Sequence, residues 1–126
     1  MKKKNVCIYV RTRYSSRYPL DKETVQWYAQ DCIAIIPSHP DWNLIGIYVD
    51  TKSGSGTNRP GLNQLIADIE EKSIELIIVH HSSVITQNTT FLRRFKETVE
   101  ERGAEIYDAL EKGDIEPYSI SKLYYM

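Results

Sequence analysis

The sequence predicts an open α/β sheet, mostly parallel, with helices on both faces. Short apolar segments of strand length alternate with segments of helical periodicity, which is typical of parallel crossover units. The segment from Ile74 to Val79 is almost continuously apolar, as expected for a strand that helices cover on both faces. A chain of 126 residues has the length of one domain with an ordinary core. We therefore expect a three-layer domain over residues 1–115, followed by a tail or the start of a further helix over residues 116–126.

Four strands are expected from apolar runs that are bounded by charged or turn-forming residues. The first run, Asn5 to Val10, is short and lies between charged residues, which favours a buried strand. The second, Trp42 to Asp50, is rich in β-branched and aromatic residues. The other two expected strands are 74–79 and 104–107.

Three helices are expected from apolar residues at helical spacing and from signals at the helix ends. Asp21 can cap the first helix, and Pro37 would stop it. Pro60 suits the first turn of the second helix. The third helix is expected over residues 89–102, with Gly103 as the residue that ends it.

The composition argues for a protein without a metal or a cofactor. The two cysteines, Cys7 and Cys32, lie in apolar surroundings without the spacing of metal ligands, so we expect buried, reduced thiols. Lys2 to Lys4 is followed by a strand rather than by an apolar leader, and no stretch could span a bilayer. We therefore expect a cytoplasmic protein. The net charge of −1 shows no general preference for nucleic acid, although basic residues gather near the start of the chain.

Polar segments follow three of the predicted strands. They are 11–16, 50–59 and 80–88. Because the carboxyl ends of parallel strands meet at one edge of a sheet, and ligands gather there, we expect these segments to converge. Arg11, Arg13 and Arg59 would then lie near one another and bind sulfate or phosphate, since guanidinium groups stay charged and bond two oxygens at once. The alternative is that Glu23 or Asp50 neutralises them within the protein.

Three short motifs resemble the catalytic domain of the serine recombinases, the resolvase/invertase family that cuts and rejoins DNA. They are Tyr9-Val10-Arg11-Thr12-Arg13, Tyr48-Val49-Asp50 and Asn58-Arg59-Pro60-Gly61-Leu62, and the resemblance covers roughly residues 5–110. The family's reaction uses a serine nucleophile and several arginines, with no metal. The resemblance implies that Arg11 and Arg59 are retained members of that arginine set.

Other family positions are altered in this chain. The resemblance places Arg13 where the family has its nucleophilic serine, and Val84 and Gln87 where it has two arginines that hold the scissile phosphate. Asn88 is kept, while Glu23 takes the place of a glutamine. These changes imply a domain that cannot cut DNA, because a guanidinium is protonated at working pH and cannot attack phosphorus.

Three functions remain open at this point. The first is a non-catalytic, resolvase-like domain of a mobile element's recombination system, which binds DNA weakly or indirectly and pairs with its own copy or with an active recombinase. The second is an active recombinase that uses Ser15 or Ser16 as its nucleophile. The third is a protein-interaction or small-ligand domain on the same fold, with no role in DNA binding. His80 and His81 are interpreted as strand-end histidines, because adjacent side chains on a strand point to opposite faces and cannot chelate one metal together.

Overall fold

The computed structural model describes residues 3–12, 21–51, 59–81, 89–110 and 113–114. The helices are α1 (Lys22–Ala34), α2 (Pro60–Glu71) and α3 (Thr89–Glu101), with a short 3-10 helix at Ile36–Ser38. The strands are β1 (Lys4–Thr12), β2 (Trp42–Thr51), β3 (Leu76–Val79), β4 (Glu105–Asp108) and β5 (Gly113–Asp114). The expected tail over residues 116–126 lies outside the described residues.

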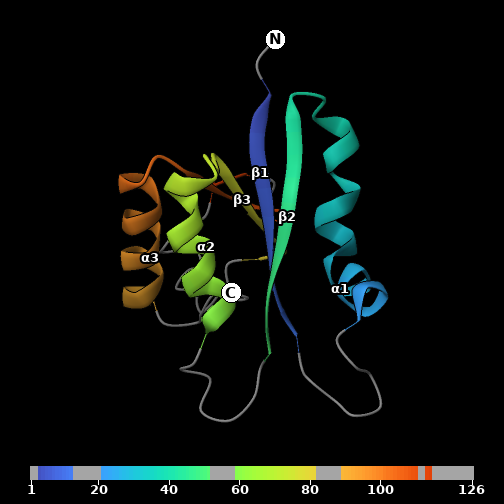
Figure 1. Cartoon of the computed structure of the whole chain (residues 1–126), viewed down its shortest axis with the longest axis horizontal. Coiled ribbons are helices and arrows are strands. Elements are labelled where there is room, and N and C mark those ends of the chain that lie inside the picture. Colours follow the sequence, from blue (N-terminus) through green and yellow to red (C-terminus); the bar gives the residue numbers. More distant parts are fainter. Residues whose placement is uncertain (1–2, 13–20, 52–58, 82–88, 111–112, 115–126) are drawn as a thin grey trace, which may run out of the picture.

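The sheet has the strand order β2-β1-β3-β4-β5. The first four strands run parallel, and β5 pairs with β4 in the antiparallel direction. Figure 1 shows α1 on one face of the sheet, with α2 and α3 on the other. The predicted fold class, an open and mostly parallel sheet between two layers of helix, is confirmed.

Alternate residues of β1 contribute to two separate cores. On the face covered by α2 and α3, Cys7 and Tyr9 pack with residues of both helices, among them Leu65, Leu92 and Val99. On the face covered by α1, the packed residues are Val6, Ile8, Val10, Ala29, Cys32, Trp42, Leu76 and Ile78. Because strand side chains alternate between faces, one strand serves both layers. All four residues of β3 are buried, which agrees with its apolar sequence.

The helix ends follow the sequence signals. The Asp21 carboxylate accepts a hydrogen bond from the Thr24 backbone N–H at 2.7 Å, so it caps α1 as expected. Pro60 occupies the first position of α2. Gly103 follows α3 with a φ of 91°, a conformation that costs glycine little.

Some strand boundaries differ from the sequence expectation. β1 runs two residues further, to Thr12, because it keeps pairing with β2 as far as Thr51. β3 begins at Leu76 rather than Ile74, because the Ile74 N–H bonds to the Ile69 carbonyl in the turn that ends α2. The two-residue strand β5 was missed, since two residues carry no periodicity.

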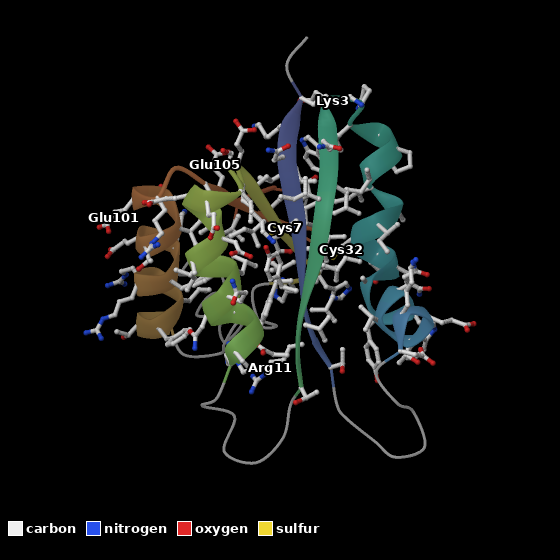
Figure 2. All side chains as sticks on the ribbon, viewed as in Figure 1. Lys3, Cys7, Arg11, Cys32, Glu101 and Glu105 are labelled. Carbon is white, nitrogen blue, oxygen red and sulfur yellow. The ribbon has the colours of Figure 1, made fainter. Side chains whose placement is uncertain are left out.

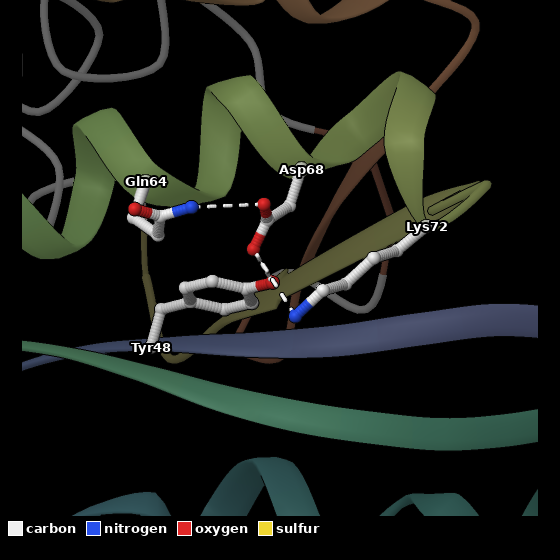
Figure 3. Close-up of polar contacts among 4 residues, drawn as sticks. All are labelled: Tyr48, Gln64, Asp68 and Lys72. Carbon is white, nitrogen blue, oxygen red and sulfur yellow. Dashed lines mark hydrogen bonds and ion pairs between the residues drawn. The ribbon is translucent and has the colours of Figure 1, made fainter.

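A buried carboxylate joins α2 to β2 (Figure 3). Asp68 accepts hydrogen bonds from the Tyr48 hydroxyl at 2.7 Å and from the Gln64 side-chain amide at 2.9 Å. Lys72 Nζ lies 3.4 Å from the same carboxylate. These contacts, that of Tyr48 first, lower the pKa of Asp68 and keep it charged.

Both cysteines are buried free thiols, as expected. Burial, and secondly the charge of Asp68, raises the pKa of Cys7 to about 12. Burial also raises the pKa of Cys32 to about 12. In the part of the chain that the structure describes, no helix is long and apolar enough to cross a membrane.

Candidate functional site

Two arginines lie at the carboxyl edge of the sheet. Arg11 is the next-to-last residue of β1, and Arg59 directly precedes α2. Figure 2 shows Arg11 at the end of β1, near the first turn of α2. Burial, and then the charge of Arg11, lower the pKa of Arg59, while Tyr9 and Asp50 raise it. Arg11 pairs with Asp50 in the register of β1 and β2, and Asp50 bonds to the first turn of α2, so both arginines lie near this carboxylate. The Asp50 charge offsets part of the repulsion between them.

Asp50 fixes the start of α2 against the end of β2. This residue is 2% exposed. One carboxylate oxygen accepts the Gly61 N–H at 2.6 Å, and the other accepts the Leu62 N–H at 2.9 Å and the Tyr9 hydroxyl at 2.7 Å. The first N–H groups of a helix have no partner within the helix and favour a negative charge, so the Asp50 carboxylate satisfies both needs. Arg59 is thereby held at a set position relative to β1.

Gly61 permits this close approach. A Cβ atom at this position would lie 2.5 Å from the Val49 carbonyl oxygen and 2.9 Å from Asp50 Oδ1. No side chain fits at such distances, so only glycine lets the helix start so near the strand. Pro60 thus suits the first position of the helix, and Gly61 leaves the space that the strand backbone and the Asp50 carboxylate occupy.

Tyr9 supports the same arrangement from the centre of the sheet. Burial, and then its hydrogen bond to Asp50, raise the pKa of the Tyr9 hydroxyl. The phenol therefore remains protonated and donates to the carboxylate. This bond ties β1, which carries Arg11, to the carboxylate that positions Arg59.

The side chain of Arg59 is supported by α3. Its Cζ atom lies over the Phe91 ring, 5.6 Å from the ring centroid. A cation over an aromatic face is attracted by the ring's quadrupole. Phe91 is 43% exposed, so this contact lies at the surface of the domain. Asp50 therefore holds the helix start that directly follows Arg59, and Phe91 supports the Arg59 side chain.

The two histidines after β3 point in different directions, as the alternation of side chains predicts. His80 Nε2 lies 3.0 Å from Asp31 Oδ2 on α1. His81 Nδ1 lies 2.9 Å from Asp108 Oδ2 at the end of β4. Among the described residues, no three His, Cys, Asp or Glu side chains form a group that could hold a metal.

The structure thus brings together two of the predicted site residues, Arg11 and Arg59. The remaining positions of interest, Arg13, Ser15, Ser16, Val84 and Gln87, lie outside the described residues. Glu23 lies in the first turn of α1, on its exposed surface.

Sequence reasoning left Tyr9 and Phe91 without a role at the site, and it considered Asp50 only as a carboxylate that could neutralise the arginines. Tyr9 and Asp50 belong to the Tyr-x-Arg and Tyr-x-Asp motifs. A carboxylate at a strand end, followed by Pro-Gly at a helix start, was a signal for Asp50. Phe91 had no such signal, because its contact with Arg59 depends on how two helices pack.

A sequence profile described as "Resolvase, N terminal domain" matches residues 6–124 of the chain. The chain belongs to the resolvase family of serine recombinases. A comparison with curated protein sequences gave no match.

Solved structures of recombinase and integrase catalytic domains share the fold of this resolvase domain. A resolvase family site-specific recombinase from Streptococcus pneumoniae matches with a TM-score of 0.69 and 21% identity, over 98% of this chain and 85% of the other. The N-terminal catalytic domain of TP901-1 integrase matches with a TM-score of 0.65 and 21% identity, over 96% and 88%. The C-terminal catalytic domain of ISC1926 TnpA, an IS607-like serine recombinase, gives 0.65 and 18%, over 96% and 78%.

The described part of the resolvase domain can therefore offer a fixed pair of cations at one edge of the sheet. Such a pair suits the non-bridging oxygens of a phosphate group, because guanidinium donors match that geometry and keep their charge. Hydrogen bonds to Asp50 join β1, β2 and the start of α2, and all three elements set the position of this pair.

Proposed function

We propose that this resolvase domain is a non-catalytic DNA-binding domain of a recombination system. The observation that supports it best is the arginine pair, with Arg59 fixed by Asp50 and Phe91 beside Arg11. The Asp50 carboxylate offsets part of the repulsion between these cations, and a bound anion would offset more of it. A DNA phosphate is the anion that the family membership suggests.

The proposed loss of catalysis rests on the altered family positions. Arg13 replaces the nucleophile, and Val84 and Gln87 replace two cations. Losing one fixed donor at a transition state typically costs on the order of a hundred- to thousand-fold in rate. Losing two cations and the nucleophile leaves phosphate binding without cleavage.

A role in recombination then depends on partners. We propose that the domain pairs with its own copy or with an active recombinase, and that its own contact with DNA is weak. Weak binding follows because Arg11 and Arg59 neutralise few phosphates, and most DNA affinity at moderate salt comes from such contacts.

The test is binding of a short DNA duplex at several salt concentrations, measured by fluorescence anisotropy. Arg11→Gln and Arg59→Gln should each weaken binding at low salt and reduce the dependence on salt by about one counterion. Arg102→Gln is the matched control, since it removes the same charge beside Lys3 and Gly103, away from the two arginines.

Thermal unfolding of each variant shows whether the fold is kept. Equal weakening by all three substitutions would mean a general charge effect and would contradict a phosphate site. An absence of binding at low salt would favour a protein-interaction role for the fold instead.

A further inference from the structure

A histidine and an aspartate form a polar pair on the same face of the sheet as the arginines. His81 Nδ1 lies 2.9 Å from one Asp108 carboxylate oxygen, and the other oxygen accepts the Leu110 N–H at 3.0 Å. Tyr107 and Ala109 pack on the face covered by α1. Because side chains of a strand alternate, Asp108 between them belongs to the face covered by α2 and α3. We call His81 and Asp108 the His81 dyad.

The His81 dyad reaches the same edge of the sheet as Arg11. β1 and β3 pair in register as far as Ile8 and Ile78. Arg11 follows three residues later on β1, and His81 follows three residues later on the segment that continues β3. Tyr9 packs against α2 and α3, so Arg11, two residues further, points to the same face. His81 and Arg11 therefore lie at one level of this face, at its carboxyl edge.

Several elements place charges around the His81 dyad. β4 supplies the Asp108 carboxylate, β1 supplies Arg11, and Arg59 precedes α2. On α3, the half-buried Lys96 is the least exposed of the charged side chains. Asp108 favours a positive imidazole and the cations oppose it, so an anion bound beside them would favour the positive form further.

The contact with Asp108 determines what the other ring nitrogen can do. A carboxylate only accepts, so Nδ1 carries a hydrogen, and Nε2 is left on the side of the ring turned away from β4. β1 flanks β3 on that side. A neutral ring offers a lone pair at Nε2, which a phosphate oxygen avoids, whereas a protonated ring offers an N–H that donates to the oxygen. Histidine ordinarily changes between these two forms near neutral pH.

We propose that His81 is a further phosphate ligand at the arginine site and that it binds in its protonated form. This inference rests on the proposed DNA-binding function and adds a dependence on pH to it. Arg11 and Arg59 offer charged donors at every working pH, and His81 adds a third donor as the pH falls below neutral. Binding of a DNA phosphate and protonation of His81 therefore favour each other.

The experiment follows binding of a short DNA duplex by fluorescence anisotropy between about pH 5.5 and about pH 8, at constant low salt. A phosphodiester keeps its charge over this range, so a change in affinity reports on the protein. We expect binding to strengthen about ten-fold toward the acidic end, the value of one hydrogen bond to a charged group. His81→Gln should remove most of this dependence.

His80→Gln is the matched control. It removes the adjacent histidine, which also contacts an aspartate, but the pair of His80 and Asp31 lies against α1, with side chains 47% and 62% exposed. This variant should keep the pH dependence of the natural chain. Asp108→Asn is a second test, because losing the charge that favours a positive ring should move the strengthening of binding to lower pH. Urea unfolding at both ends of the pH range shows whether each variant keeps its fold.

An unchanged pH dependence in His81→Gln, with binding still weakened by Arg11→Gln, would overturn the third donor and leave the arginine site standing. Equal losses of pH dependence in His81→Gln and His80→Gln would overturn it in favour of a general effect of positive charge. A His81→Gln variant that is less stable but keeps the pH dependence would reduce the dyad to a structural contact. An absence of DNA binding at every pH would overturn the proposed function together with this inference.

Discussion

Gly61 is the residue on which the geometry of the arginine site depends most closely. Its missing side chain lets the Asp50 carboxylate and the Val49 carbonyl approach the first turn of α2. The position of Arg59 is therefore linked to a residue that has no functional group of its own.

We expect Gly61→Ala to destabilise the fold by about 1–3 kcal/mol, because the added methyl group forces the helix away from the strand. Gly46→Ala on β2 is the control, since a Cβ there meets nothing within 4 Å. Chemical denaturation of both variants measures the difference. Equal stabilities would show that the start of α2 can shift freely and that Gly61 does not set its position.

Phe91 offers a second test at the scale of single residues. We expect Phe91→Ala to weaken DNA binding about two- to five-fold, the value of an exposed cation–aromatic contact. Phe91→Tyr should retain binding, because it keeps an aromatic face.

The double variant Phe91→Ala, Arg59→Gln shows whether Phe91 affects DNA binding through Arg59 or independently of it. If Phe91 acts by holding Arg59, then Phe91→Ala should cause no further weakening once Arg59 is replaced. Additive losses in the double-mutant cycle would show that Phe91 contributes in another way.

At the scale of elements, hydrogen bonds to two buried carboxylates attach α2 to the sheet. Asp50 bonds to its first turn, and Asp68, in its third turn, accepts the Tyr48 hydroxyl of β2. The helix is thus fixed at two points along its length, which keeps both its start and its direction constant.

The lowered pKa of Asp68 predicts a specific dependence on pH. A carboxyl group whose folded pKa lies below its unfolded value stabilises the fold above the unfolded value, near 4. This contribution is lost as the pH falls through the folded pKa. The stability difference between the natural chain and Asp68→Asn should therefore be constant above about pH 5 and shrink below about pH 4.

Urea unfolding at a series of pH values measures this difference. Tyr48→Phe should cause a smaller loss of stability with the same dependence on pH, since it removes the first of the contacts that lower the pKa of Asp68. A difference that grew toward low pH would contradict the assignment of Asp68 as a charged, hydrogen-bonded group.

The same elements show what the sequence could predict. Asp21, Pro60 and Gly103 act through local backbone geometry, so they located helix ends correctly. The strand ends were less certain, because β1 is prolonged by its partner β2 and β3 is shortened by a turn that closes onto α2. Pairing of this kind depends on residues far apart in the chain.

The candidate site was predictable in part for a related reason. Arg11 and Arg59 follow strands whose carboxyl ends must meet in a parallel sheet, so their proximity follows from topology. The contact between Arg59 and Phe91, and that between His81 and Asp108, depend on how elements far apart in the chain pack against one another. No periodicity in the sequence carries that information.

At the scale of the whole molecule, the fold is that of a recombinase catalytic domain, whereas the altered motif positions argue against catalysis. The scaffold is that of the resolvase family, with the arginine pair in place. The motif resemblance places Arg13, Val84 and Gln87 where the family has its nucleophile and two further cations, and this placement remains a prediction. We account for this by a domain that keeps phosphate binding and lacks strand cleavage.

The most direct measurement is the mobility of supercoiled plasmid DNA incubated with the protein at low salt, read before and after denaturing detergent. We expect retarded DNA before detergent, and unmodified supercoiled DNA without attached protein after it. Arg13→Ser should give the same result, because the serine alone does not restore the two missing cations. Nicked DNA or a covalent protein–DNA adduct from the natural chain, abolished by Ser15→Ala or Ser16→Ala, would contradict the account and identify an active enzyme.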